Sequence, residues 1–128
     1  MTKKRTFKTK TFNKWMRKTD LKDQDLLFSV AEMEAGLVDA DLGGNVYKKR
    51  IALPGMGKRA GARTLVAGKI FRRWFFIFGF VKNEKDSIND DELVHLQGVA
   101  NRLLHLTDKD IEEAILAGEL KELINNAK

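Results

Sequence analysis

The sequence predicts a single α+β domain over residues 1–128, in which one strand and two helices precede a three-stranded antiparallel meander and further helices. Three observations support this fold class. A chain of 128 residues, 43% of them hydrophobic, is the size of one domain and can bury a core. Apolar runs with the alternation of strands lie between positions 46 and 81. On either side of them, apolar residues recur at the spacings of three and four that are typical of helices.

The first predicted elements are a strand and two helices. Residues 1–10 form a basic arm and the first strand, and apolar residues at helical spacing follow at positions 12, 15 and 16. A second helix is predicted from Asp23 to Gly36, because acids lie near its start and a glycine can end it. Residues 37–45 are acidic and contain two adjacent glycines, so they are expected to link the helices to a sheet.

The meander begins with a half-exposed strand over residues 46–53. Alternation places Lys48 and Arg50 on one face, and it places the following side chains on the other: Tyr47, Lys49, Ile51 and Leu53. Residues 54–61 are expected to form a flexible basic turn. The chain is then expected to return as a strand over residues 62–70, with Arg63 near its start.

The third strand of the meander is predicted over residues 74–81. This run is apolar at almost every position, which is typical of a central strand that is covered on both faces. Its aromatic side chains are therefore expected to belong to the core, and not to a platform on which bases stack.

Helices are predicted to follow the sheet. Ser87 or Asn89 can cap a long helix, and the apolar stripe of that helix has five members: Leu93, Leu96, Ala100, Leu103 and Leu104. Thr107 and Asp110 have the spacing of a second capping box. One or two short helices are therefore expected over residues 107–128.

Positive charge is concentrated in two parts of the chain. Residues 1–22 carry nine Lys or Arg against one Asp, and residues 45–85 carry eleven against one Glu, while the other segments are acidic and the net charge is +6. Clustered cations suit a polyanion such as nucleic acid, or an acidic protein that covers the same surface. A basic protein with no specific partner has the same composition, so both interpretations stay open.

Composition also excludes some classes of protein. The chain has no cysteine, so neither disulfides nor thiolate metal sites are possible, and its two histidines cannot assemble a metal cluster alone. Its longest apolar stretch, Trp74 to Val81, is too short to cross a bilayer, and no apolar run follows the charged N-terminus. The sequence therefore predicts a cytoplasmic protein with no membrane partner.

The order of the predicted elements, and the residues that occupy them, resemble the RelE/ParE toxin superfamily of bacterial toxin-antitoxin pairs. More closely, the chain resembles the RelE-like branch known as HigB in three segments: Val46 to Arg50, Gly55 to Arg63, and Trp74 to Lys85 with Ile88. The resemblance runs from about Phe7 to Leu123. It implies a twisted antiparallel sheet with two N-terminal helices packed on one face.

The resemblance also implies an activity. Many members of this family cut messenger RNA without a metal, often in the ribosomal A site, by attack of the 2′-hydroxyl on the adjacent phosphate. Such a site must remove a proton from the hydroxyl, stabilise charge on the phosphorane and assist the leaving oxygen. Lysine and arginine can do most of this work, and no cofactor is implied.

Four positions correspond to the catalytic positions of the family: Lys48, Arg50, Arg63 and Lys82. Arg63 would clamp the phosphate, because its planar fork suits phosphate oxygens. Lys48 or Lys82 would act as base or acid only where neighbouring cations favour the neutral amine. Six further cations are expected to bind RNA: Lys49, Lys58, Arg59, Arg72, Arg73 and Lys85.

Simpler interpretations compete with these assignments. The three cations at positions 48–50 also suit an edge strand whose charges prevent pairing with another chain, and Arg63 also suits a structural ion pair. The glycine-rich turn lacks the spacing of a phosphate-binding Walker loop. The arm from Lys3 to Lys10 suits RNA contact and disorder equally.

One departure from the family weakens the enzymatic interpretation. Several relatives use a tyrosine or histidine near the last strand or the C-terminus, whereas Tyr47 is the only tyrosine here and His95 and His105 lie on or beside a helix. Ribosome-assisted catalysis and a weakened enzyme are both open. So are two other functions, a ParE-like protein that poisons DNA gyrase and a nonenzymatic RNA-binding regulatory domain.

The resemblance implies two partners. One is messenger RNA, in many members on the ribosome. The other is a cognate antitoxin, commonly of the helix-turn-helix type, with an acidic or helical segment that covers the cationic sheet.

Overall fold

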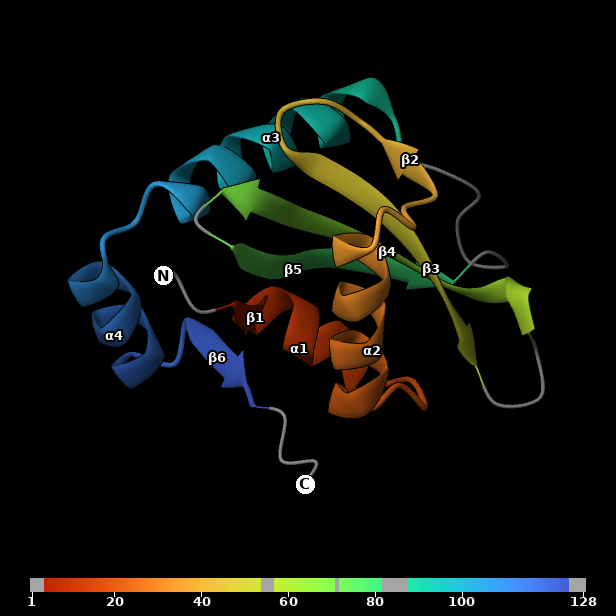
Figure 1. The fold of residues 1–128 in the computed structure, drawn as a ribbon, viewed down its shortest axis with the longest axis horizontal. Helices are drawn as coiled ribbons and strands as arrows, with labels where there is room; N and C mark the ends of the chain where they lie inside the picture. The colour runs from red at the N-terminus through yellow and green to blue at the C-terminus, as the bar shows by residue number, and fades with distance from the viewer. Residues whose placement is uncertain (1–3, 54–56, 71, 82–87, 125–128) are drawn as a thin grey trace.

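One mixed sheet organises the chain (Figure 1). The computed structural model describes residues 4–53, 57–70, 72–81 and 88–124, and for residues 57–60 and 69–70 the description stops at the backbone. In chain order the described elements are β1 (Arg5–Thr9), α1 (Lys10–Met16), α2 (Asp23–Glu34), β2 (Ala40–Asp41), β3 (Val46–Leu53), β4 (Gly57–Ile70), β5 (Arg73–Val81), α3 (Asp90–Leu104), α4 (Asp108–Leu116) and β6 (Leu120–Leu123). Across the sheet the strands lie in the order β2-β3-β4-β5-β1-β6.

The predicted meander is confirmed, because β3 pairs antiparallel with β4 and β4 pairs antiparallel with β5. The expectation of a wholly antiparallel sheet is corrected at one place. The first strand, β1, runs parallel to β5 and antiparallel to β6. A parallel pair needs a long crossover connection, and here the two helices and the first two strands of the meander supply it.

Helices cover the sheet on both faces. Side chains from α1 and α2 pack on one face in a core cluster that includes Trp74 and Phe76, and α3 and α4 pack on the other face with Phe75 and Ile77. Figure 1 shows α3 on the side of the sheet away from α1 and α2. The prediction that the apolar strand is central and buried on both faces is confirmed.

Local signals in the sequence set the starts of the helices. Thr9 caps α1, where its hydroxyl accepts a hydrogen bond from the backbone of Phe12 at 3.1 Å. Reciprocal capping boxes begin α3, through Asn89 and Glu92, and α4, through Thr107 and Asp110, as predicted. None of the described helices is long and apolar enough to cross a membrane.

The C-terminal segment differs from its prediction, because a strand follows α4 where a further helix was expected. Leu120 and Leu123 are three residues apart, a spacing that suits one face of a helix. In β6 the same spacing places Leu120 in the core on the α3 face and Leu123 in the core on the α2 face. An edge strand that contributes to both layers therefore imitates helical periodicity.

Two smaller differences lie in the connections. Residues 37–45 were expected to form only a link, but they include the two-residue strand β2. The basic turn was expected to extend to residue 61, but β4 already begins at Gly57, so the backbone of Lys58 and Arg59 belongs to a strand.

Glycine at position 68 is required by the core, and this gives a test of the packing. A methyl group added there meets the six-membered ring of the fully buried Trp74, which has no room to move. We expect Gly68→Ala to lower the free energy of unfolding by about 1–3 kcal/mol, the usual cost of overpacking. The measurement is urea unfolding followed by tryptophan fluorescence.

Gly98, within α3, provides the control. A methyl group there has its nearest neighbour at 3.8 Å, in the Arg102 side chain. Gly98→Ala should raise the stability by about 0.5–1 kcal/mol, because alanine favours the helix. Equal effects of the two substitutions would contradict the described packing around Trp74.

Candidate functional site

The candidate site begins with the two faces of β3, which the structure separates as predicted. Lys48 lies opposite Leu65 of β4, and Leu65 belongs to the core on the α3 face. Cross-strand partners share a face, so Lys48, and Arg50 two residues later, also lie on that face. Tyr47 and Ile51 belong instead to the core beneath α2.

Arg50 and Arg63 are brought directly opposite each other on β3 and β4. Opposed residues of this kind have their Cβ atoms about 5 Å apart. Arg63 in turn lies opposite Phe80 of β5, so two arginines and an aromatic ring form one row across three strands. Lys48 lies on the same face of β3, two residues before Arg50. We call the three cations Lys48, Arg50 and Arg63 the cation row.

The two arginines differ in their surroundings. Arg63 is 6% exposed, and its Nη1 donates a hydrogen bond to the carbonyl oxygen of Gly61 at 3.1 Å. Among the described residues, none accepts a hydrogen bond from the Arg50 guanidinium, and its Nε atom is buried without a partner. Like charges across a strand pair are destabilising, and an unsatisfied buried donor adds to that cost.

Lys49, which was expected to bind RNA, is buried on the opposite face. Its ammonium group donates to the carbonyl oxygen of Leu37 at 2.9 Å and lies 3.1 Å from the Glu32 carboxylate of α2. Lys8 of the basic arm is held similarly, 2.8 Å from Asp23 at the start of α2. These two lysines therefore attach α2 to the sheet, and neither belongs to an RNA-facing surface.

Arg72 and Arg73 lie at the far end of β5 from the cation row. Seven residues separate Arg73 from Phe80, which is roughly 24 Å along a strand. Arg73 donates to the carbonyl oxygen of Leu106 at 2.5 Å and to Asp108 at 2.6 Å. The structure therefore does not bring these two arginines together with Arg50 and Arg63.

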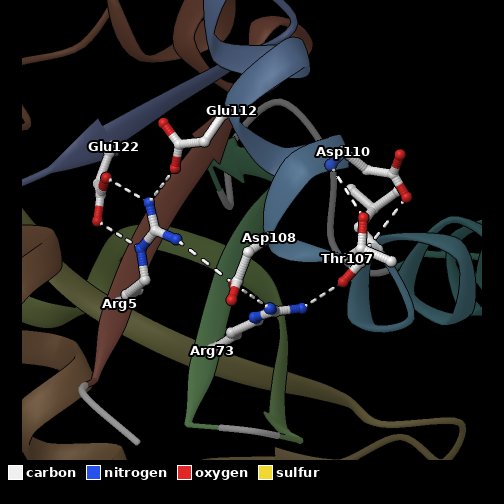
Figure 2. A network of polar contacts seen from close by, with 8 residues as sticks. Arg5, Arg73, Thr107, Asp108, Asp110, Glu112 and Glu122 are labelled. Atoms are coloured by element: carbon white, nitrogen blue, oxygen red, sulfur yellow. Dashed lines mark hydrogen bonds and ion pairs between the residues drawn. The ribbon is translucent and has the colours of Figure 1, made fainter.

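Figure 2 shows that Arg73 belongs to a network of ion pairs that secures the C-terminal elements. Arg5 of β1 donates two hydrogen bonds to Glu122 of β6, at 2.8 and 2.9 Å, and one to Glu112 of α4 at 2.9 Å. The hydrogen bond with Glu122, followed by that with Glu112, raises the pKa of Arg5, although burial opposes them. These cations neutralise local carboxylates and hold α4 and β6 to the sheet.

Arg72 forms an ion pair with Glu34, at the end of α2. The Glu34 carboxylate accepts hydrogen bonds from the indole of Trp74 at 2.8 Å and from Arg72 at 3.0 Å. Burial alone raises the pKa of Glu34, but these two hydrogen bonds outweigh burial and hold the pKa below its ordinary value of 4.5. We therefore leave Lys49, Arg72 and Arg73 out of the proposed RNA surface.

The side chains of the remaining candidate cations fall outside the part of the chain that the structure describes. Lys82 and Lys85 belong to the segment 82–87, and for Lys58 and Arg59 only the backbone is described. Their expected roles in catalysis and RNA binding stay predictions.

One carboxylate lies beside the cation row, because Asp39 accepts a hydrogen bond from the backbone N–H of Arg50 at 2.7 Å. The tyrosine and histidine types that relatives use lie elsewhere in the described structure. Tyr47 lies on the α2 face and is 8% exposed, and burial, with the nearby Asp41, raises its pKa. His105 follows α3, where its Nδ1 lies 2.8 Å from the carbonyl oxygen of Asn101. Within the described ranges, no three acidic, histidine or cysteine side chains are grouped so that they could hold a metal ion.

The position of Phe80 beside Arg63 was not predicted from the sequence, whose apolar run placed Phe80 in the core. Phe80 is 5% exposed, as expected for a core residue, but it stands beside Arg63 and 6.0 Å from the ring of Phe78. The register of β4 against β5 creates this proximity. Alternation within a single strand carries no such signal.

A comparison with protein-family models settles the family. Residues 4–123 match the family described as the RelE toxin of the RelE / RelB toxin-antitoxin system. The chain belongs to the RelE toxin family. The expected superfamily is thereby confirmed, and the match covers nearly the whole chain. A search of the curated proteins finds no match.

Membership in the RelE family identifies the protein as the toxin half of a pair, so a cognate antitoxin is its partner. The α+β architecture described above is consistent with this family. The α3 face, with its cation row, is the described surface on which the strand cations expected from the family resemblance come together.

The two faces of β3 can be tested with neighbouring lysines. Lys49→Met should lower the free energy of unfolding by about 2–4 kcal/mol, because it removes the buried ammonium group that pairs with Glu32 and donates to the carbonyl oxygen of Leu37. Lys48→Met, on the other face, should cost less than about 1 kcal/mol. Chemical denaturation measures both values, and a larger loss for Lys48→Met would contradict the assignment of faces.

The environment of Glu34 predicts a pH dependence. Because its pKa is lowered in the folded protein, Glu34 contributes stability above about pH 4.5, and this is lost as the pH falls through the lowered pKa. The stability difference between the natural protein and Glu34→Gln should be constant at pH 6–7 and shrink below pH 4.5. Urea unfolding at pH 7, 5, 4 and 3 measures it, and a difference that persists undiminished at pH 3 would disprove the assignment.

Proposed function

We propose that this RelE-family toxin inhibits translation by cutting messenger RNA, with the scissile phosphate bound at the cation row on the α3 face. The observation that carries the proposal is the opposition of Arg50 and Arg63 across β3 and β4. A structural ion pair does not account for Arg50, because no described residue accepts a hydrogen bond from its guanidinium. A bound phosphate offsets the repulsion between the two arginines and supplies acceptors for the buried donor.

The chemistry follows from the charges. The 2′-oxygen of the RNA forms a bond to the adjacent phosphorus, the bond from phosphorus to the 5′-oxygen breaks, and a 2′,3′-cyclic phosphate and a 5′-hydroxyl result. Negative charge develops on the phosphorane between these two events. The planar forks of Arg50 and Arg63 are suited to hold its equatorial oxygens, and such preorganised charge commonly supplies the largest share of catalysis.

Proton transfer is assigned to lysine. Lys48 lies on the same face of β3 as Arg50, two residues before it. Lys82 is the other lysine among the four predicted catalytic residues. Arginine cannot release its proton under ordinary conditions, so a lysine or a group of the ribosome must accept the 2′-hydroxyl proton, and a protonated lysine or ribosomal group must donate a proton to the leaving 5′-oxygen. We propose that the ribosome contributes to this step, as the family resemblance implies.

The proposal includes the setting in which the toxin acts. It is a cytoplasmic member of the HigB-like branch, and its antitoxin is of the helix-turn-helix type. The antitoxin neutralises the toxin by covering the cationic face with a segment of complementary charge. The branch and the type of antitoxin follow from the resemblance of the segments that carry the strand cations.

The test is primer extension on cellular messenger RNA after brief induction of the toxin without antitoxin. We expect cuts within translated reading frames, and we expect Arg50→Ala to reduce them at least about a hundredfold, the usual effect of removing one transition-state donor. Arg50→Lys should recover only part of the activity, because an ammonium group lacks the bidentate fork. Arg63→Ala should reproduce the loss.

Arg102→Ala is the control, because it removes the same charge from an exposed position in the last turn of α3. The Arg102→Ala variant should cut messenger RNA to the same extent as the natural protein. Growth arrest with no new cuts would overturn the proposal and direct attention to gyrase or another protein target. Neither arrest nor cuts, with RNA still bound, would favour a nonenzymatic RNA-binding domain.

A further inference from the structure

A groove lies along α3, on the side of that helix away from β3. One hollow of about 500 Å³ is floored by Ile77 and Phe78 of β5. The α3 residues Leu96 and Val99 form one wall, and Thr9 and Thr11, where β1 passes into α1, contribute the other. We call this hollow and its continuation the α3 groove.

The groove exists for two structural reasons. A bulge in the pairing of β4 with β5 places Leu65 opposite Phe78 and Val66 opposite Phe76. The extra residue is Ile77, and both Ile77 and Phe78 consequently face α3. At the same level β1 ends and α1 leaves for the other face of the sheet, so Phe78 stays only partly buried, while Ile77 beneath it is 4% exposed.

The groove continues toward the other end of α3. A second hollow of about 180 Å³ shares Thr9, Thr11 and Val99 with the first and reaches Leu106 and, on β6, Leu120. From Asp91 to the end of α3 at Leu104 the groove follows thirteen helical steps, roughly 20 Å at the rise of an α-helix, and it continues to Leu106. An extended segment of six or seven residues spans that distance.

Charge at the groove indicates what it binds. Its floor is apolar. The ionisable residues that line the two hollows are three acids, one lysine and one histidine: Asp91, Glu92, Glu119, Lys10 and His95. These acids repel an RNA phosphate, and the floor offers an RNA backbone no hydrogen bonds. A polypeptide with apolar side chains and a neighbouring lysine or arginine complements both the floor and the acids.

We propose that the cognate antitoxin docks in the α3 groove through an extended segment. Its apolar side chains rest on Ile77, Phe78 and Val99, and a basic residue faces Asp91. Phe78 is 6.0 Å from Phe80, and Phe80 lies opposite Arg63, so the groove leads toward the cation row. A segment anchored in the groove is thereby held beside the cations that bind RNA.

This inference depends on the pairing of RelE toxins with antitoxins and not on the cutting of RNA. Each proposal can therefore fail while the other survives. Antitoxin affinity tests the groove, and cleavage tests the cation row.

The experiment measures the affinity of the purified full-length toxin for its cognate antitoxin by isothermal titration calorimetry. Val99→Arg places a long cation where the two hollows meet, and Thr11→Trp fills the groove from an exposed position on the opposite wall. Both should weaken antitoxin binding at least tenfold. Val94→Arg makes the same substitution on α3 at a residue that is 66% exposed and outside the groove, and it should bind within twofold of the natural toxin.

Charge reversal adds a second test. A toxin with Asp91→Lys should bind the antitoxin at least fivefold more weakly, and the loss should shrink at high salt because the contact is electrostatic. Thermal unfolding verifies that each variant is folded, and Thr11→Trp keeps the test decisive if Val99→Arg destabilises the core.

Two results would overturn the inference. One is antitoxin affinity within twofold of the natural value for both Val99→Arg and Thr11→Trp. The other is loss of RNA cleavage by these variants with antitoxin affinity retained, which would assign the groove to RNA.

Discussion

The burial of β5 on both faces constrains the rest of the structure. Trp74 and Phe76 require a layer of helices on one side, and Phe75 and Ile77 require another on the other side. Phe7 of β1 stacks on Phe75 with the ring centroids 4.9 Å apart, which ties the N-terminal strand to the same centre. The α3 groove lies at one edge of this cover, between α3 and the junction of β1 with α1.

Among the described residues, the cations with buried atoms differ in a way that composition does not reveal. Lys8, Lys49 and Arg73 are buried, and each meets a carboxylate: Asp23, Glu32 and Asp108. These pairs hold helices to the sheet, since a buried charge without a partner is costly. Arg50 is different, because its backbone donates to Asp39 but the Nε atom of its guanidinium is buried without a partner. The proposal of a bound phosphate rests on this unsatisfied donor.

Much of the fold could be predicted because local signals agree with it. Capping residues, the stripe on α3 and the alternation in β3 each specify an element within a few residues of chain. The structure differs from the predicted fold where contacts between residues far apart in the sequence determine the secondary structure or the strand pairing. The spacing of Leu120 and Leu123 is compatible with a helix, but this segment pairs with the edge of β1 and forms a strand. The parallel pairing of β1 with β5 also has no local signal in the sequence.

The candidate site was predictable in part for the same reason. Alternation placed Lys48 and Arg50 on one face correctly, but the opposition of Arg50 and Arg63 depends on the register between two strands. The role of Lys49 depends on Glu32, seventeen positions earlier on α2, which no pattern along β3 reveals. The α3 groove depends on a bulge that the continuous apolar run of β5 conceals.

The most direct test of the cation row is the salt dependence of RNA binding. An RNA oligonucleotide with a 2′-deoxy substitution at the cut site binds without being cleaved, and fluorescence anisotropy gives its affinity at 50–200 mM salt. Each phosphate contact contributes about 0.7–1 to the slope of log affinity against log salt. Arg50→Ala should reduce that slope by about this amount, while Arg72→Ala, at the other end of β5, leaves it unchanged. An equal slope for the natural toxin and Arg50→Ala would contradict phosphate binding at the cation row.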